Sequence, residues 1–198
     1  MYRIVSFLID TSIIIESNNE ENLFYLKDGG LSDRKSISVE IFYMFSELYD
    51  RYFDPNGSKY VFCDEQQITT GVNEILKEHS PSTLQLLQSF KINHYDFVFP
   101  FVRSFFISGR IPTDGEYLFT AFIASKDPIK HAQCMIATSF ILLHGRLSSI
   151  PLNQIDMFKE IYMALMMKLE VRLLLNNSDV LEKTLEEVEL DDDNNDED

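Results

Sequence analysis

Several features that mark specialised classes of protein are missing from this 198-residue sequence. Its only two cysteines, Cys63 and Cys134, cannot form a disulfide scaffold or a four-cysteine zinc site, and we expect reduced, buried thiols. No apolar run reaches the ~18 residues of a membrane-spanning helix. The opening residues have neither the basic flank nor the small-residue cleavage site of a signal peptide. We therefore expect an intracellular protein, in the cytoplasm, the nucleus or both.

Positive charge is also scarce. The formal net charge is −15, of which residues 179–198 contribute −10 and the remainder of the chain only −5. Neither part has the basic surface that a phosphate backbone requires, so direct nucleic-acid binding is disfavoured. The acidic run 191–198 cannot bury apolar surface, and we expect it to be a disordered tail.

Motifs for cofactors and nucleophiles are absent from the sequence. It contains neither Gly-x-x-x-x-Gly-Lys nor Gly-x-Gly-x-x-Gly, the loops that bind nucleotide phosphates. Its four histidines include no pair at i, i+4, and neither cysteine lies in a nucleophile signature. We expect no cofactor and no enzymatic activity. The histidines are His79, His94, His131 and His144.

The opening stretch is the most informative part of the chain. Residues 3–9 form an apolar run of strand length, which is typical of a strand buried on both faces. Asp10-Thr11-Ser12 follows directly, at the position where open α/β sheets bind ligands. This arrangement predicts an α/β fold with a functional loop at the end of its first strand.

The rest of the chain reads as alternating helices and strands, which favours a mostly parallel central sheet with helices on both faces. Residues 95–107 favour a helix bent or begun near Pro100, with a strand as the alternative, and 117–124 fit either. The further elements expected are strands at 59–63, in the first half of 131–143 and at 170–175, and helices at 37–53, 81–90, 154–169 and 178–190.

Asp10-Thr11-Ser12 admits a metal site of the adhesion type, Asp-x-Ser-x-Ser, in which a carboxylate and two hydroxyls hold a hard divalent cation. Asp10 and Ser12 fit this pattern, but Ile14 stands at the third position and has no oxygen to coordinate a metal. The site is therefore degenerate, and we expect no bound metal. In a purely structural interpretation, Asp10 caps backbone amides at the strand-to-loop turn.

A PIN-type ribonuclease is the enzymatic alternative for the same stretch, because its opening also reads as an apolar strand, Asp-Thr-Ser and aliphatics. Such nucleases gather three or four acids around one or two metal ions. Asp10 would be the first acid and Glu74 the second. Neither the run 131–143 nor its approach supplies a further acid within a helix pattern.

Residues 3–177 resemble a von Willebrand factor A-type domain in the order of their expected strands and helices. In this resemblance, Ile4 to Ser12 would form the first strand and a degenerate metal-binding loop. Within that superfamily the chain most resembles the ubiquitin-receptor subunits of the proteasome regulatory particle. These subunits also begin at the first strand, carry Ile-Asp-x-Ser there, and have a Ser-Val-Glu helix like Ser38-Val39-Glu40.

The resemblance implies a Rossmann-like domain that acts as a non-enzymatic scaffold of a large intracellular complex, with proteasome lid or base subunits as partners. Asp10, Thr11 and Ser12 would then be protein-contact residues. Ubiquitin binding is in doubt, because residues 181–188 have neither the alanine nor the serine of the family's ubiquitin-binding helix. The alternative subunit is the von Willebrand A subunit of TFIIH, whose family carries a zinc module that two distant cysteines cannot supply.

Overall fold

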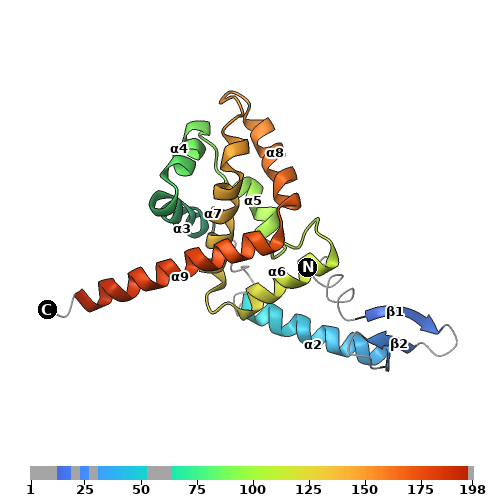
Figure 1. The fold of residues 1–198 in the computed structure, drawn as a ribbon. Coiled ribbons are helices and arrows are strands. Elements are labelled where there is room, and N and C mark those ends of the chain that lie inside the picture. The colour runs from blue at the N-terminus through green and yellow to red at the C-terminus, as the bar shows by residue number, and fades with distance from the viewer. Residues whose placement is uncertain (1–12, 19–22, 27–30, 53–63, 196–198) are drawn as a thin grey trace.

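The computed structural model describes residues 13–18, 23–26, 31–52 and 64–195, and these form an all-α protein with a small sheet near the N-terminus (Figure 1). The strands β1, β2 and β3 pair antiparallel in the order β1-β2-β3. The strands are β1 (Ile13–Asn18), β2 (Leu23–Leu26) and β3 (Leu31–Asp33). The helices are α2 (Arg34–Tyr52), α3 (Glu65–His79), α4 (Pro81–Phe90), α5 (Tyr95–Val102), α6 (Pro112–Ala124), α7 (Pro128–Leu147), α8 (Ile155–Lys168) and α9 (Val171–Asn195).

This architecture contradicts the predicted α/β fold. Within the described ranges the chain has eight helices, no parallel pair of strands and no strand after residue 33. The expected central sheet of a Rossmann-like von Willebrand A domain is therefore missing, and the resemblance to that family is wrong. The strands predicted at 3–9 and 59–63 lie outside the described residues.

Helix α7 occupies the position predicted for the central strand, and it is the centre of the helical body. Asp127 starts it by accepting hydrogen bonds from the amides of Ile129 and Lys130, at 2.9 and 3.0 Å, and Pro128 supplies the first helical residue. It packs against α3, α4, α6, α8 and α9. A helix surrounded in this way is apolar on every side, which explains why 131–143 lacked a helical period and resembled a buried strand.

Helix α9 begins where the last strand was predicted, at 170–175. Val171, Leu174 and Ser178 are all buried and recur at the spacing of one helical face, which packs on α7. Ser178, expected to begin a helix, instead lies within α9 and donates its hydroxyl to the carbonyl of Leu174 at 2.9 Å. Figure 1 shows α9 crossing the helical body and then extending away from it towards the C-terminus.

The aromatic run from Tyr95 to Phe106 forms α5 and the turn after it, which confirms the preference for a helix there. Pro100 lies inside this short helix, and the chain leaves helical geometry soon afterwards. Phe105 and Phe106 then adopt positive φ values of 51° and 60°, and both are buried. Most of these aromatic rings are part of the core, so the run is not an exposed docking patch.

The helices predicted at 37–53, 81–90 and 154–169 are confirmed as α2, α4 and α8. Residues 117–124, left open between helix and strand, belong to α6. Within the described ranges, no helix combines the length and the apolar character that crossing a lipid bilayer requires.

Candidate functional site

Helix α2 is the described helix that lies apart from the others, below the body formed by α3 to α9 (Figure 1). Its neighbour in the fold is the small sheet, through β3. Asp33 fixes its start, because the carboxylate accepts hydrogen bonds from the amides of Lys35 and Ser36 at 2.8 and 3.0 Å. These bonds, the one from the Ser36 amide above all, lower the pKa of Asp33.

Apolar side chains lie on two sides of α2, and only one side is covered. Ile37 is buried, and Ile41 and Phe45 follow at intervals of four residues with partial burial. The opposite side carries Val39, Phe42 and Tyr43, which are exposed to solvent, and Met44 is exposed beside the covered stripe, since it lies seven residues after Ile37. We call these four exposed apolar residues the α2 patch. The patch consists of Val39 (46% exposed), Phe42 (65%), Tyr43 (65%) and Met44 (42%).

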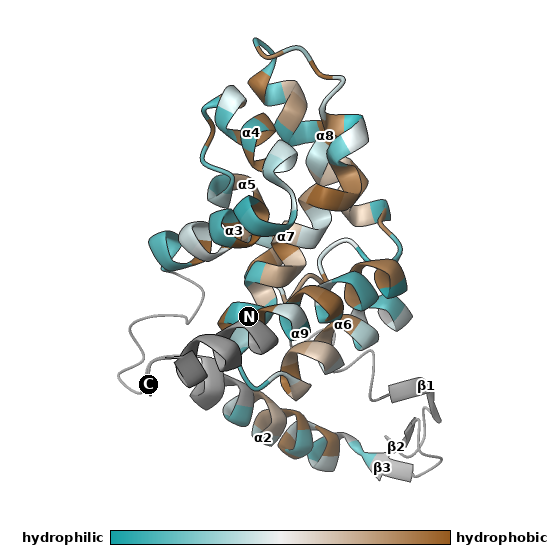
Figure 2. Cartoon of the chain, turned by 60° about the vertical axis from the view of Figure 1, so that its left-hand side comes forward, coloured by the Kyte–Doolittle hydropathy of each residue, from teal (hydrophilic) through white to brown (hydrophobic). Residues whose placement is uncertain are grey.

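The α2 patch has the composition of a protein contact surface. Single exposed apolar residues are normal on any protein, but here four of them fall within six positions of one helix. The rings of Phe42 and Tyr43 lie edge to face, with centroids 5.9 Å apart. Aromatic residues and methionine are enriched at interfaces relative to the rest of a protein surface. In Figure 2, α2 lies below the packed helices and carries both hydrophobic and hydrophilic residues.

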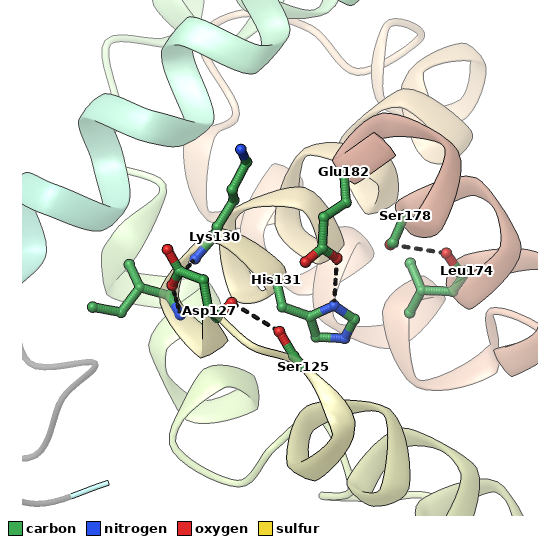
Figure 3. Close-up of polar contacts among 8 residues, drawn as sticks. Ser125, Asp127, Lys130, His131, Leu174, Ser178 and Glu182 are labelled. Atoms are coloured by element: carbon green, nitrogen blue, oxygen red, sulfur yellow. Dashed lines mark hydrogen bonds and ion pairs between the residues drawn. The ribbon is translucent and has the colours of Figure 1, made fainter. Parts of the chain in front are cut away.

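The other candidate is a polar contact between α7 and α9 (Figure 3). The Nδ1 atom of His131 lies 2.9 Å from a carboxylate oxygen of Glu182, and both side chains are largely buried. An ionised carboxylate only accepts hydrogen bonds, so His131 donates from Nδ1. Phe122 covers the imidazole edge to face at 4.8 Å, and Nε2 is buried without a hydrogen-bond partner. This pair holds α9 on α7.

Glu74, the second acid of the nuclease hypothesis, lies on α3 in a shallow polar depression that also includes Asp64 and Gln133. The side chain of Gln133 crosses from α7, donates to the carbonyl of Gln67 at 3.0 Å, and lies where a Cβ on Gly71 would clash. In the part of the chain that the structure describes, no three histidines, cysteines or acids come together as a metal would require. Asp10, the first acid of the nuclease hypothesis, lies outside the described residues, so that hypothesis stays a prediction.

The other residues predicted to act at a site are dispersed or lie outside the described ranges. Asp10, Thr11 and Ser12 are outside them, and Ile14 belongs to β1. Cys134 is a buried free thiol, as predicted, and burial raises its pKa to about 12. Cys63 lies outside the described residues. Of the histidines, His94 and His131 are buried, and His79 and His144 are partly buried.

The sequence predicted the helix α2, but its exposed apolar side was not predicted. Ile41 and Phe45, whose spacing of four residues is typical of one helical face, lie on the covered side. Val39, Phe42 and Tyr43 form a second stripe at helical spacing, which was visible in the sequence as a surplus of apolar residues over one face. Neither a family model, nor a curated protein, nor a solved structure matches this chain.

Proposed function

We propose that this protein is a non-enzymatic interaction subunit that binds a protein partner through the α2 patch. The observation that carries the proposal is the 65% exposure of two adjacent aromatic residues, Phe42 and Tyr43, on a helix that lies apart from the other described helices. Interface hot spots are enriched in tyrosine and tryptophan and are buried in pockets of the partner. Positions 39, 42 and 43 have the spacing by which an amphipathic helix docks in a groove.

The partner we propose is a different protein that presents an apolar groove within a basic surface. A net charge of −15 makes two copies of this chain repel each other at long range, and it attracts a basic protein. The assignments to the proteasome regulatory particle and to TFIIH depended on the von Willebrand A resemblance, which the fold removes. The proposal therefore names the chemistry of the partner and not a particular complex.

The test begins with affinity purification of the wild-type chain and a Phe42→Ser/Tyr43→Ser variant, with bound proteins quantified by mass spectrometry. The matched control is Val180→Ser, since Val180 is 64% exposed on α9 and lies outside the patch. A partner recovered with both wild type and control is then purified. Its affinity for all three proteins is measured by calorimetry.

We expect the Phe42→Ser/Tyr43→Ser variant to weaken binding by at least about 30-fold, the effect of losing one hot spot of ~2 kcal/mol. The Val180→Ser control should stay within about twofold of wild type. Equal binding of wild type and double variant would contradict the proposal. So would a dimer of the wild-type chain that the double variant abolishes, or magnesium-dependent RNA cleavage that Asp10→Asn removes.

A further inference from the structure

Two exposed acids, Glu40 and Glu47, divide the α2 patch. An α-helix turns by about 100° per residue, so Met44 lies about 100° around α2 from Tyr43. In the same direction from Tyr43, Glu47 lies at about 40° and Glu40 at about 60°, which places both acids within that arc. A partner that contacts Tyr43 and Met44 together must therefore cross the two carboxylates.

The helix also fixes the spacing of the two acids and the charges beside them. Glu40 and Glu47 are seven residues apart, which separates them by about 10 Å along the axis of α2. Arg51 lies one turn after Glu47, but no basic residue lies one turn from Glu40. The residues at those positions are Ser36, Ile37, Tyr43 and Met44. Helix α2 itself therefore supplies no cation to Glu40.

The two carboxylates restrict which partner surface fits the patch. Covering them with apolar groups would be costly, because a buried ion without a counter-charge loses its hydration. A basic side chain in the same place forms charge-assisted hydrogen bonds with a carboxylate instead. Tyr43 is 65% exposed and Met44 42%, so both sides of the acids can enter a contact. The patch therefore fits a surface on which basic groups lie between two apolar pockets.

We propose that the partner carries two basic side chains, about 10 Å apart, that pair with Glu40 and Glu47 between its pockets for Tyr43 and Met44. This inference rests on the proposed function, because it describes the same contact surface in more detail. The aromatic residues of the patch supply most of the affinity. The two glutamates set the register of the partner on α2 and determine which basic protein binds.

The test uses the full chain and the partner purified in the affinity experiment above. Glu40→Gln/Glu47→Gln keeps the size of both side chains and removes their charge. Glu74→Gln/Glu160→Gln is the matched control, since it changes the net charge equally at exposed acids of α3 and α8. Dissociation constants are measured by calorimetry at about 50 and about 300 mM NaCl, because salt screens charges at the edge of an interface.

We expect Glu40→Gln/Glu47→Gln to weaken binding at least about tenfold at the lower salt concentration. Its affinity should also depend less on salt than the affinity of wild type does. The control should stay within about twofold of wild type at both salt concentrations. Met44→Ser should weaken binding at least about fivefold, because the contact extends past the acids and buries this side chain.

The possible failures separate this inference from the proposed function. Unchanged binding in Glu40→Gln/Glu47→Gln or in Met44→Ser, with binding still weakened in Phe42→Ser/Tyr43→Ser, would overturn the inference alone. Tighter binding after the two glutamates are neutralised, or an equal loss in the control, would have the same meaning. Wild-type affinity in Phe42→Ser/Tyr43→Ser, or recovery of no partner, would overturn both.

Discussion

The hydroxyl of Tyr162 lies 2.7 Å from Oγ of Ser139, and the two groups are completely buried between α8 and α7. Ser139 donates its own proton to the carbonyl of Ile136, also at 2.7 Å. Ser139 must therefore accept from Tyr162, which fixes the direction of the chain of hydrogen bonds. The Tyr162 ring stacks on Phe140 at 4.6 Å, so this polar pair is enclosed by aromatic core.

Ser139→Ala should lower the free energy of unfolding by about 1–3 kcal/mol, because it leaves the Tyr162 hydroxyl buried without an acceptor. The Ser139→Ala/Tyr162→Phe double variant removes both polar groups and should recover part of this loss. The coupling between the two side chains is measured by urea denaturation of the wild type, Ser139→Ala, Tyr162→Phe and the double variant. If the loss of unfolding free energy in the double variant equals the sum of the losses in the two single variants, the hydrogen bond contributes nothing to stability.

Glu182→Ala should destabilise the packing of α9 on α7, because it leaves both ring nitrogens of His131 buried without partners (Figure 3). We expect a loss of about 1–3 kcal/mol in the free energy of unfolding. Glu182→Gln keeps an oxygen that can accept from Nδ1 and should lose less. Asp179→Ala, an exposed acid on the same helix, is the control and should change stability by no more than about 0.5 kcal/mol. Equal losses for all three variants would show that the pair does not hold α9.

The fold was predictable where helices are covered on one face and unpredictable where they are covered on all faces. Helix α8 has buried Phe158, Tyr162 and Met166 at intervals of four, and its period was clear in the sequence. Helix α7 is surrounded, so its apolar run had no period and was taken for a strand. The 20-residue length of α7 and its start at Asp127-Pro128 were the available helix signals.

The error in α9 had a different cause. Leu173-Leu174-Leu175 reads locally as an apolar strand, but only Leu174 of the three is fully buried. The helical period becomes visible when Val171, Leu174 and Ser178 are taken together, and a buried serine conceals it. The candidate site was equally hard to predict, because both sides of α2 are apolar and sequence alone does not determine which is covered.

Acid should destabilise this protein through His94. Burial lowers its pKa in the folded state to about 4, below the ordinary 6.5 that the unfolded chain retains. Between these values the unfolded state binds more protons, so stability is full above pH 6.5 and falls as the pH approaches 4. The expected loss is roughly 3 kcal/mol over that window. The His94→Phe variant lacks this titration, and its unfolding free energy should fall less than that of wild type between pH 7 and pH 4. Parallel pH profiles would contradict the assignment.

Lys91→Gly should stabilise the protein, against the usual direction for glycine substitutions. Lys91 follows the last residue of α4 with φ of 50° and ψ of 36°, the left-handed conformation in which a side chain is strained. Glycine is the preferred residue at such a helix end because it has no Cβ. We expect a gain of up to about 1 kcal/mol in the free energy of unfolding, measured by urea denaturation.

The control for this prediction is Lys77→Gly, at an exposed lysine in the last turn of α3. Lys77 has ordinary helical geometry, so glycine there should destabilise by up to about 1 kcal/mol. Opposite signs for the two lysines would locate the effect in the backbone conformation of Lys91, since both substitutions remove the same side chain and charge. A loss of stability in Lys91→Gly as large as that in Lys77→Gly would mean that the left-handed conformation carries no strain.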